Sequence, residues 1–123
     1  EQVNLISVDL LKSEAGLGYR AEYLRNVVDA FLECDSFLGW PTENMLAALR
    51  KIKGLGEYSV NHVAMLLGNF ENIPVDSEVR AYMRRCKRSD DIKSIQDHFA
   101  KWHPYQTLAY RIERKLTAQC CEY

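Results

Sequence analysis

Near its centre the chain reads Leu49-Arg50-Lys51-Ile52-Lys53-Gly54-Leu55-Gly56-Glu57-Tyr58-Ser59. Two glycines around one apolar residue let the backbone turn sharply, because glycine adopts conformations that are closed to other residues. The free N–H groups of Gly56 and of the first turn of the next helix would point outward together, and such donors bind anions. The stretch therefore predicts either an ordinary helix–helix turn with a glycine cap or a helix-hairpin-helix that holds a DNA phosphate.

Helical periodicity continues on both sides of this turn. One apolar stripe predicts a helix over about 19–34, and a shorter helix is expected near 7–15. Two further helices are expected to begin at N-caps, which are Thr42 and Ser89. The last helix is expected to carry Pro104 in its first turn. Their expected apolar faces are Met45, Leu46, Leu49 and Ile52; Val60, Val63, Ala64 and Leu67; Val79, Tyr82, Met83 and Cys86; Ile92, Ile95, Phe99 and Trp102; and Leu108, Ile112 and Leu116. No alternating strand pattern is visible, so we expect an all-α helical bundle forming a single domain over residues 1–123.

Composition excludes several classes of protein. Sixteen basic against 17 acidic residues give a net charge of −1, which excludes a polycationic coat but allows a local basic patch. No apolar run approaches the roughly 18 residues of a membrane span, and residues 1–20 show no secretory signal. The four cysteines lack CxxC spacing, which favours a reducing compartment; they are Cys34, Cys86, Cys120 and Cys121. We therefore expect an intracellular protein (cytoplasm with nucleoid, or nucleus) without a membrane partner. The densest positive stretch is 80–88, and a solvated face is its simplest interpretation.

An acidic residue begins the helix that follows the second helix of the turn, in the stretch Ile73-Pro74-Val75-Asp76-Ser77-Glu78-Val79. N-capping is the plainest role for Asp76. In combination with the glycine turn, however, this stretch resembles the helix-hairpin-helix DNA glycosylase superfamily, which includes endonuclease III. Two more segments, 16–24 and Trp102-His103-Pro104-Tyr105, are similar to family segments, so the resemblance covers about 16–114.

The resemblance implies that Asp76 is the catalytic carboxylate. Breaking an N-glycosidic bond builds positive charge on the deoxyribose, and an ionised carboxylate beside the sugar stabilises that charge. Members that also cut the strand carry a lysine two residues after the second hairpin glycine, which attacks the sugar. That position holds Tyr58 here. We therefore expect a monofunctional enzyme that uses water, similar to 3-methyladenine DNA glycosylase II or 8-oxoguanine DNA glycosylase, on an alkylated or oxidised purine.

The resemblance also implies a pocket for a base that has left the stack. Tyr58 and His62 lie one turn apart on the second hairpin helix, and Tyr110 and Arg114 lie one turn apart on the last helix. Other interpretations remain open: His62 as a partly buried core histidine and Arg114 as the partner of a surface carboxylate.

Further roles are implied around the hairpin. DNA-backbone contacts are expected from Lys51, Lys53, Gly54, Gly56 and Ser59. Tyr19 and Arg20 resemble a wedge that enters the duplex, although Tyr19 could equally pack against a neighbour. The backbone carbonyls of Arg50, Ile52 and Leu55 are expected to hold a monovalent cation (K+ or Na+), and no other cofactor is expected. The cysteine spacing does not fit the iron–sulfur cluster of some relatives.

The expected partner is double-stranded DNA containing a damaged base, bound by a monomer. The family domain normally contains more helices before residue 16, so we expect this chain to be a fragment of a larger family domain, possessing activity only if the cleft is complete. Two alternatives from other classes remain: a non-catalytic helix-hairpin-helix module that grips duplex DNA, and a helical protein-interaction domain.

Overall fold

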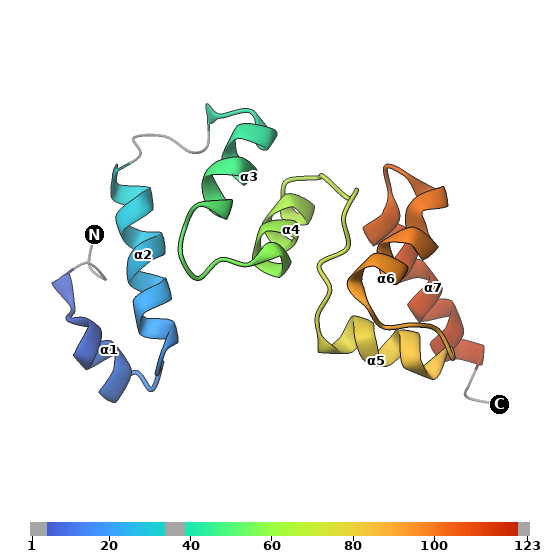
Figure 1. The fold of residues 1–123 in the computed structure, drawn as a ribbon, viewed down its shortest axis with the longest axis horizontal. Helices are drawn as coiled ribbons and strands as arrows, with labels where there is room; N and C mark the ends of the chain where they lie inside the picture. The colour runs from blue at the N-terminus through green and yellow to red at the C-terminus, as the bar shows by residue number, and fades with distance from the viewer. Residues whose placement is uncertain (1–4, 34–38, 121–123) are drawn as a thin grey trace. The chain divides into compact units, whose positions relative to one another are not determined.

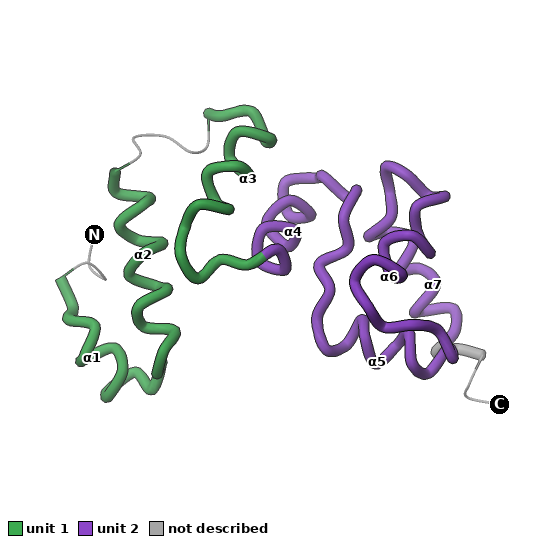
Figure 2. Tube along the Cα trace, viewed as in Figure 1, with its two compact units in different colours: residues 1–56 green, residues 57–123 purple. Residues whose placement is uncertain are grey.

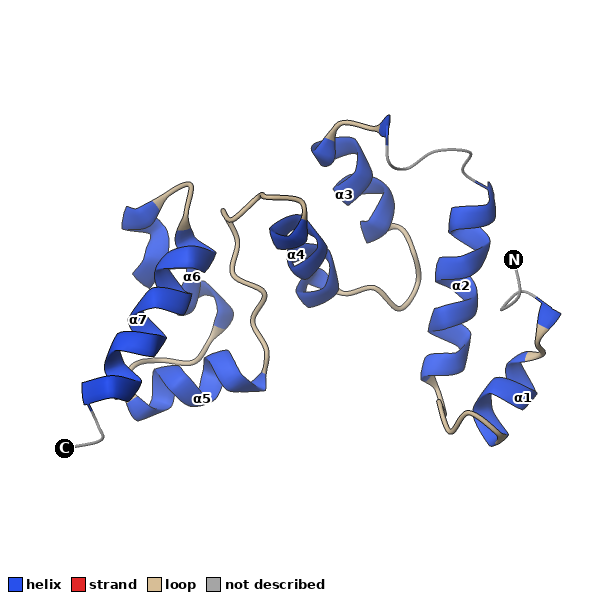
Figure 3. Ribbon diagram, turned by 180° about the vertical axis from the view of Figure 1, so that it is seen from behind, coloured by secondary structure: helices blue, strands red, loops and turns tan. Residues whose placement is uncertain are grey.

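The computed structural model describes residues 5–33 and 39–120, and the regular structure of these residues is helical (Figures 1 and 3). The elements, in chain order, are α1 (Val8–Ser13), α2 (Arg20–Glu33), α3 (Thr42–Arg50), α4 (Glu57–Leu66), α5 (Ser77–Arg85), α6 (Ile92–Phe99), the 3-10 helix η3 (Ala100–Trp102) and α7 (Gln106–Cys120). Because no strand occurs within these residues, the expected all-α class is confirmed for them. None of the helices in this part of the chain has the length and apolarity needed to cross a membrane.

The chain divides into two compact units, which Figure 2 colours separately. Unit 1 is Glu1–Gly56 and holds α1 to α3, and unit 2 is Glu57–Tyr123 and holds α4 to α7. The boundary falls inside the expected hairpin, between its second glycine and the first residue of α4. The helix-hairpin-helix geometry and the single-domain organisation therefore stay predictions.

Two of the expected helix caps are wrong. Thr42 is the first residue of α3, and Pro41 takes the cap position without a side-chain hydrogen bond. At α6 the cap is Asp91, whose Oδ1 accepts the N–H of Ser94 at 2.9 Å. Ser89, the expected cap, instead donates its hydroxyl to the Asp91 carboxylate. A carboxylate accepts a backbone N–H more strongly than a hydroxyl does, so the aspartate holds the cap position.

The last helix also begins later than expected. α7 starts at Gln106, so Pro104 lies in the connection before it rather than in its first turn. In the same region α6 ends at Phe99, and Trp102 lies in η3 instead of continuing the α6 stripe. Trp102 is accordingly exposed, whereas Phe99 is fully buried.

A cluster of buried side chains from α5, α6, α7 and the connection before α5 forms the core of unit 2. Its members are Ile73, Val79, Tyr82, Met83, Ile95, Phe99 and Tyr110. The rings of Tyr82 and Phe99 both meet the Tyr110 ring edge to face, with centroids 5.6 and 6.0 Å away. Edge-to-face packing of this kind adds about 1 kcal/mol per pair to the burial itself.

The face of α7 that meets this core is not the expected apolar one. Ile112 and Leu116 are 60% and 57% exposed, while Tyr110 is 6% exposed. The inward stripe is instead Tyr110, Glu113 and Thr117, at positions i, i+3 and i+7 of the helix. Two of these residues are polar, and they face inward because they hydrogen-bond to α5.

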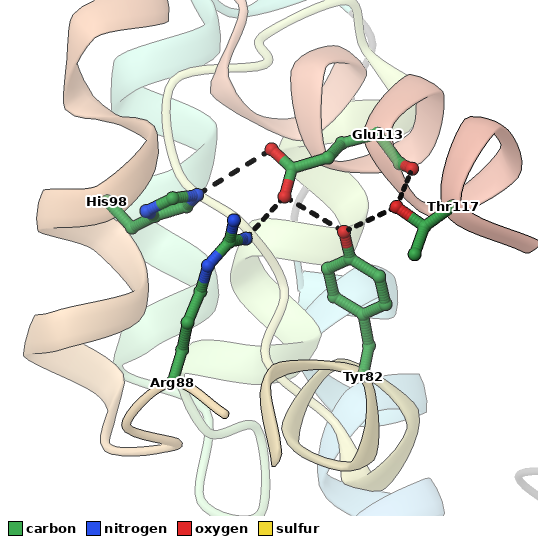
Figure 4. A network of polar contacts seen from close by, with 5 residues as sticks. All are labelled: Tyr82, Arg88, His98, Glu113 and Thr117. Atoms are coloured by element: carbon green, nitrogen blue, oxygen red, sulfur yellow. Dashed lines mark hydrogen bonds and ion pairs between the residues drawn. The ribbon is translucent and has the colours of Figure 1, made fainter. Parts of the chain in front are cut away.

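A polar network fixes this orientation of α7 (Figure 4). The Tyr82 hydroxyl donates to Oε1 of Glu113 at 2.8 Å, and Arg88 donates to the same oxygen. Nε2 of His98 lies 3.6 Å from Oε2 of Glu113, too far for a hydrogen bond. Thr117 completes the network, because its hydroxyl donates to the Glu113 carbonyl at 2.9 Å and lies 3.4 Å from the Tyr82 oxygen. The Glu113 carboxylate therefore ties α7 to α5 and to the α5–α6 connection.

The network changes how its members ionise. Burial raises the pKa of Tyr82 to about 12. Burial also pushes the pKa of Glu113 upward, but the hydrogen bonds from Arg88 and Tyr82 outweigh it, so this pKa lies below its usual range. The phenol is therefore held neutral as a donor and the carboxyl is held ionised as an acceptor.

In unit 1, the turn after α3 depends on one glycine. Gly54 has a φ of +105°, a region that side chains rarely adopt. A Cβ at this position would lie 2.3 Å from Cγ and Cδ1 of Tyr23 on α2. The approach is possible only without a side chain, so α2 packs directly on the backbone of the turn. Asn26, one turn further along α2, donates its Nδ2 to the Lys53 carbonyl at 2.9 Å.

We expect Gly54→Ala to destabilise unit 1 by more than about 2 kcal/mol, because positive-φ strain adds to the clash with the Tyr23 ring. Urea unfolding followed by circular dichroism measures the change. Gly16→Ala is the control in the same unit: Gly16 also has a positive φ, but nothing lies within 4 Å of its added Cβ. Equal effects of the two substitutions would contradict the close packing of Tyr23 on the turn.

We expect Tyr82→Phe to lower the free energy of unfolding by about 1 kcal/mol near neutral pH, because a hydrogen bond to a partly buried carboxylate is lost. The folded pKa of Tyr82, about 12, lies above the ordinary tyrosine value of about 10. This contribution is therefore complete below pH 10 and is lost as the pH rises toward 12. The free energy of unfolding, measured with urea at several pH values across this range, should fall more steeply for the wild type than for Tyr82→Phe. Tyr105→Phe, which alters an exposed phenol, should behave as the wild type does.

Candidate active site

A half-open cavity of about 570 Å³ lies within unit 2. α4 contributes Tyr58 and His62 to its lining, the residue before α5 contributes Asp76, and α7 contributes Tyr110 and Arg114. All five side chains that the sequence assigned to catalysis and base binding thus meet in one cavity. The volume lies in the range of small-ligand pockets, which is about 300–1,000 Å³.

Asp76 is held in place by the helix that it begins. Its Oδ1 accepts the N–H of Val79 at 2.8 Å, so the expected N-cap role is confirmed. The other carboxylate oxygen makes no hydrogen bond within the described residues and is free to meet a ligand. The side chain is half-buried, which limits both its mobility and its contact with water. A carboxylate fixed in this way can stabilise positive charge without reorganising first.

Tyr110 forms the inner wall of the cavity. Burial raises the pKa of its phenol; the charge of Arg114 and a hydrogen bond from it act in the opposite direction, and the negative charge of Asp76 adds to the rise. The phenol therefore stays neutral at physiological pH. The influence of Asp76 on this pKa also indicates that the two side chains share one electrostatic environment.

Arg114 lies beside Tyr110 and is already partnered. Its Nη2 donates to Oε2 of Glu78 at 3.1 Å, and Nη1 makes a long contact of 3.5 Å with the Tyr110 hydroxyl. Pairing with a surface carboxylate was one of the two interpretations left open by the sequence, and the structure contains that pair. Exposed ion pairs contribute about 0–1 kcal/mol, so the guanidinium can leave Glu78 for a ligand at little cost.

Tyr58 and His62 form the α4 side of the cavity. Their ring centroids lie 5.7 Å apart with the planes tilted by 43°. Tyr58 is 44% exposed and His62 is half-buried, so the interpretation of His62 as a partly buried core histidine stays open beside that of a pocket residue. Two rings that remain open to the cavity offer faces on which a planar ligand can stack.

The residues expected on the DNA backbone are divided between the units. Lys51 and Lys53 are exposed and line a cavity of about 860 Å³ in unit 1, together with residues of α2 and α3. Gly54 and Gly56 belong to the same unit, whereas Ser59 belongs to unit 2. Their joint contact with one strand therefore stays a prediction.

The expected wedge residues also lie in unit 1. Tyr19 is 66% exposed, as a side chain that enters a duplex must be. Its ring also meets that of Tyr23 edge to face at 5.7 Å, and the Arg20 guanidinium lies 5.6 Å from its centroid. Tyr19 therefore packs against its neighbours, as the simpler interpretation expected, and its role as a wedge stays untested.

No group of three or more His, Cys, Asp or Glu side chains within the described residues could hold a metal ion. This finding concerns side chains, so the monovalent cation expected on carbonyls of Arg50, Ile52 and Leu55 stays a prediction. One of those carbonyls, that of Ile52, accepts the Leu55 N–H at 3.1 Å. Among the cysteines, Cys34 and Cys121 and the side chain of Cys120 lie outside the described residues.

Two basic residues of the cavity were missed in the sequence. Arg111 and Lys115 line it from α7, beside Arg114. The signal was their spacing, because residues at i, i+3 and i+4 share one face of a helix. Along the chain the run at 80–88 is denser in positive charge and therefore more conspicuous.

No protein-family profile, curated protein or solved structure matches this chain. What the chain does is therefore inferred from the chemistry of the cavity and from the sequence pattern.

Proposed function

We propose that this chain is the catalytic part of a monofunctional DNA glycosylase that hydrolyses the N-glycosidic bond of a damaged purine. The observation that carries the proposal is the single cavity lined by Asp76, by the aromatic rings of Tyr58 and Tyr110, and by basic side chains of α7. A carboxylate beside stacking surfaces and cations meets the three needs of the reaction: charge stabilisation, base binding and strand binding.

The reaction follows from the fixed carboxylate. As the bond between base and sugar breaks, positive charge develops on the deoxyribose ring, and the free oxygen of Asp76 stabilises it across the cavity. Water then attacks the sugar, with the same carboxylate positioned to orient it or to accept its proton. The departing base rests against the Tyr58 and His62 rings, and Arg114 can donate to its edge after leaving Glu78.

Substitution of Asp76 by asparagine separates catalysis from folding. Asparagine is as good an N-cap as aspartate, so the α5 cap is kept while the charge is removed. We expect release of free base from duplexes carrying alkylated or oxidised purines to fall by about 100-fold or more, with affinity for the duplex retained. Chromatography of the released base and fluorescence anisotropy of a labelled duplex measure the two quantities.

Asp91→Asn is the matched control, because Asp91 caps α6 through the same hydrogen bond but does not line the cavity. Its base release should equal that of the wild type. Unchanged release in Asp76→Asn would eliminate Asp76 as the catalyst. Salt-dependent duplex binding by a wild type that releases no base from any lesion would favour the non-catalytic DNA-binding module instead.

We expect no covalent protein–DNA adduct after borohydride treatment during the reaction. The lyase position is occupied by Tyr58, which has no amine to form a Schiff base. Lys115 is the amine among the residues that line the cavity, and it is exposed. Gel analysis of the trapped reaction tests this. An adduct that disappears in Lys115→Gln would replace water by that lysine as the nucleophile.

A further inference from the structure

α7 presents three positive charges to the cavity from one face. Arg111, Arg114 and Lys115 occupy positions i, i+3 and i+4, and all three line the cavity. Like charges at such spacings repel and cost a helix about 0.2–0.5 kcal/mol per pair. The helix therefore carries a local cost that an anion bound on this face would offset.

Two of these three charges have no acidic partner. Arg114 pairs with Glu78, but neither Arg111 nor Lys115 makes an ion pair or a side-chain hydrogen bond within residues 5–33 and 39–117. Both are exposed to solvent. They are therefore available to an anionic ligand without first breaking an internal contact.

The denser basic run at 80–88 behaves differently. Arg84 pairs with the Asp90 carboxylate and Arg80 donates to the Asp90 carbonyl at 2.6 Å, while Arg88 pairs with Glu113. Three of the five positive charges in that run thus have partners within unit 2: two interact with Asp90 in the α5–α6 connection, and one pairs with Glu113 on α7. The charge that remains free beside the cavity is on α7.

The cavity needs this charge if a nucleotide is to enter it. Asp76 contributes a negative charge, and every nucleotide of a strand brings a phosphate on each side of its sugar. Without cations nearby, the carboxylate would repel the strand that it must approach. Arg111 and Lys115 lie four residues apart on the helix, about 6 Å along its axis, against a phosphate spacing of about 3.4 Å along the axis of each DNA strand. Two flexible side chains at this separation can reach neighbouring phosphates of one strand.

We propose that Arg111 and Lys115 form a second phosphate-binding site, which holds the backbone of the damaged strand on either side of the nucleotide in the cavity. This inference rests on the proposed function and deepens it. It assigns strand binding to the helix that also carries Tyr110 and Arg114, independently of the glycine turn. The same helix then positions the base and the phosphates of one nucleotide together.

The test is the salt dependence of duplex binding. An undamaged duplex and the same duplex with a stable abasic-site analogue are titrated at several salt concentrations with the wild type and with Arg111→Gln/Lys115→Gln. Each phosphate contact adds about 0.9 to the slope of log K against log salt concentration. We expect the double substitution to reduce this slope by about 1 to 2 on the abasic duplex, and Arg111→Lys/Lys115→Arg to restore it.

Arg85→Gln/Lys93→Gln is the matched control, because it removes one arginine and one lysine that are exposed and do not line the cavity. An Arg111→Gln/Lys115→Gln slope equal to that of this control would overturn the inference, as would a wild type with no salt-dependent binding. Base release by Asp76→Asn is measured in parallel. If Asp76→Asn loses base release while the slope of the double variant is unchanged, the phosphate site alone is rejected. If the slope is reduced while base release by Asp76→Asn is unchanged, the catalytic proposal is rejected and the phosphate site is kept.

Discussion

The candidate site depends on the contact that Tyr82 of α5 makes with α7. The Tyr82 ring packs against Tyr110 in the core of unit 2, and its hydroxyl donates to Glu113 at 2.8 Å. Because Glu113 also accepts from Arg88, rotation of α7 would break two hydrogen bonds to one partly buried carboxylate. Loss of both donors would leave this partly buried carboxylate without compensation, so the network fixes the face that α7 turns toward the cavity.

The same contact between α5 and α7 sets the positions of the acidic and basic side chains that line the cavity. Asp76 begins α5, and the basic face of α7 lies on the helix that Tyr82 locks to α5. The acid and the cations therefore keep their separation without contacting each other directly in an ion pair. This matters chemically, since a carboxylate neutralised by an arginine would stabilise a developing positive charge far less. The carboxylates that pair with Arg88 and Arg114 are instead Glu113 and Glu78, which do not line the cavity.

Sequence patterns predicted what depends on local geometry. The α2 helix, expected over about 19–34, extends over Arg20–Glu33, and Asp76 caps α5 as its position suggested. Patterns failed where two local solutions compete, as between Ser89 and Asp91 at the start of α6. They failed again on α7, where the apolar stripe of Ile112 and Leu116 is exposed, because hydrophobicity alone does not reveal that Tyr82 recruits Glu113 into the interface. The residues of 49–59 do not decide between an ordinary turn and a helix-hairpin-helix, because the boundary between the two units falls inside this stretch.

The density of positive charge along the chain is also a poor guide to the binding face. Along the chain, the run at 80–88 is the densest in positive charge, yet Arg84 pairs with Asp90 six residues away and Arg88 pairs with Glu113, which is distant in the sequence. Arg111 and Lys115 are inconspicuous in sequence, but they line a cavity and have no ion-pair partner in the described part of the chain. A ligand anion competes poorly for a cation that already has a carboxylate, because one favourable contact must be broken to make another. Charge that the fold leaves uncompensated, next to a fixed carboxylate, is therefore a better guide to a binding face than charge density along the chain.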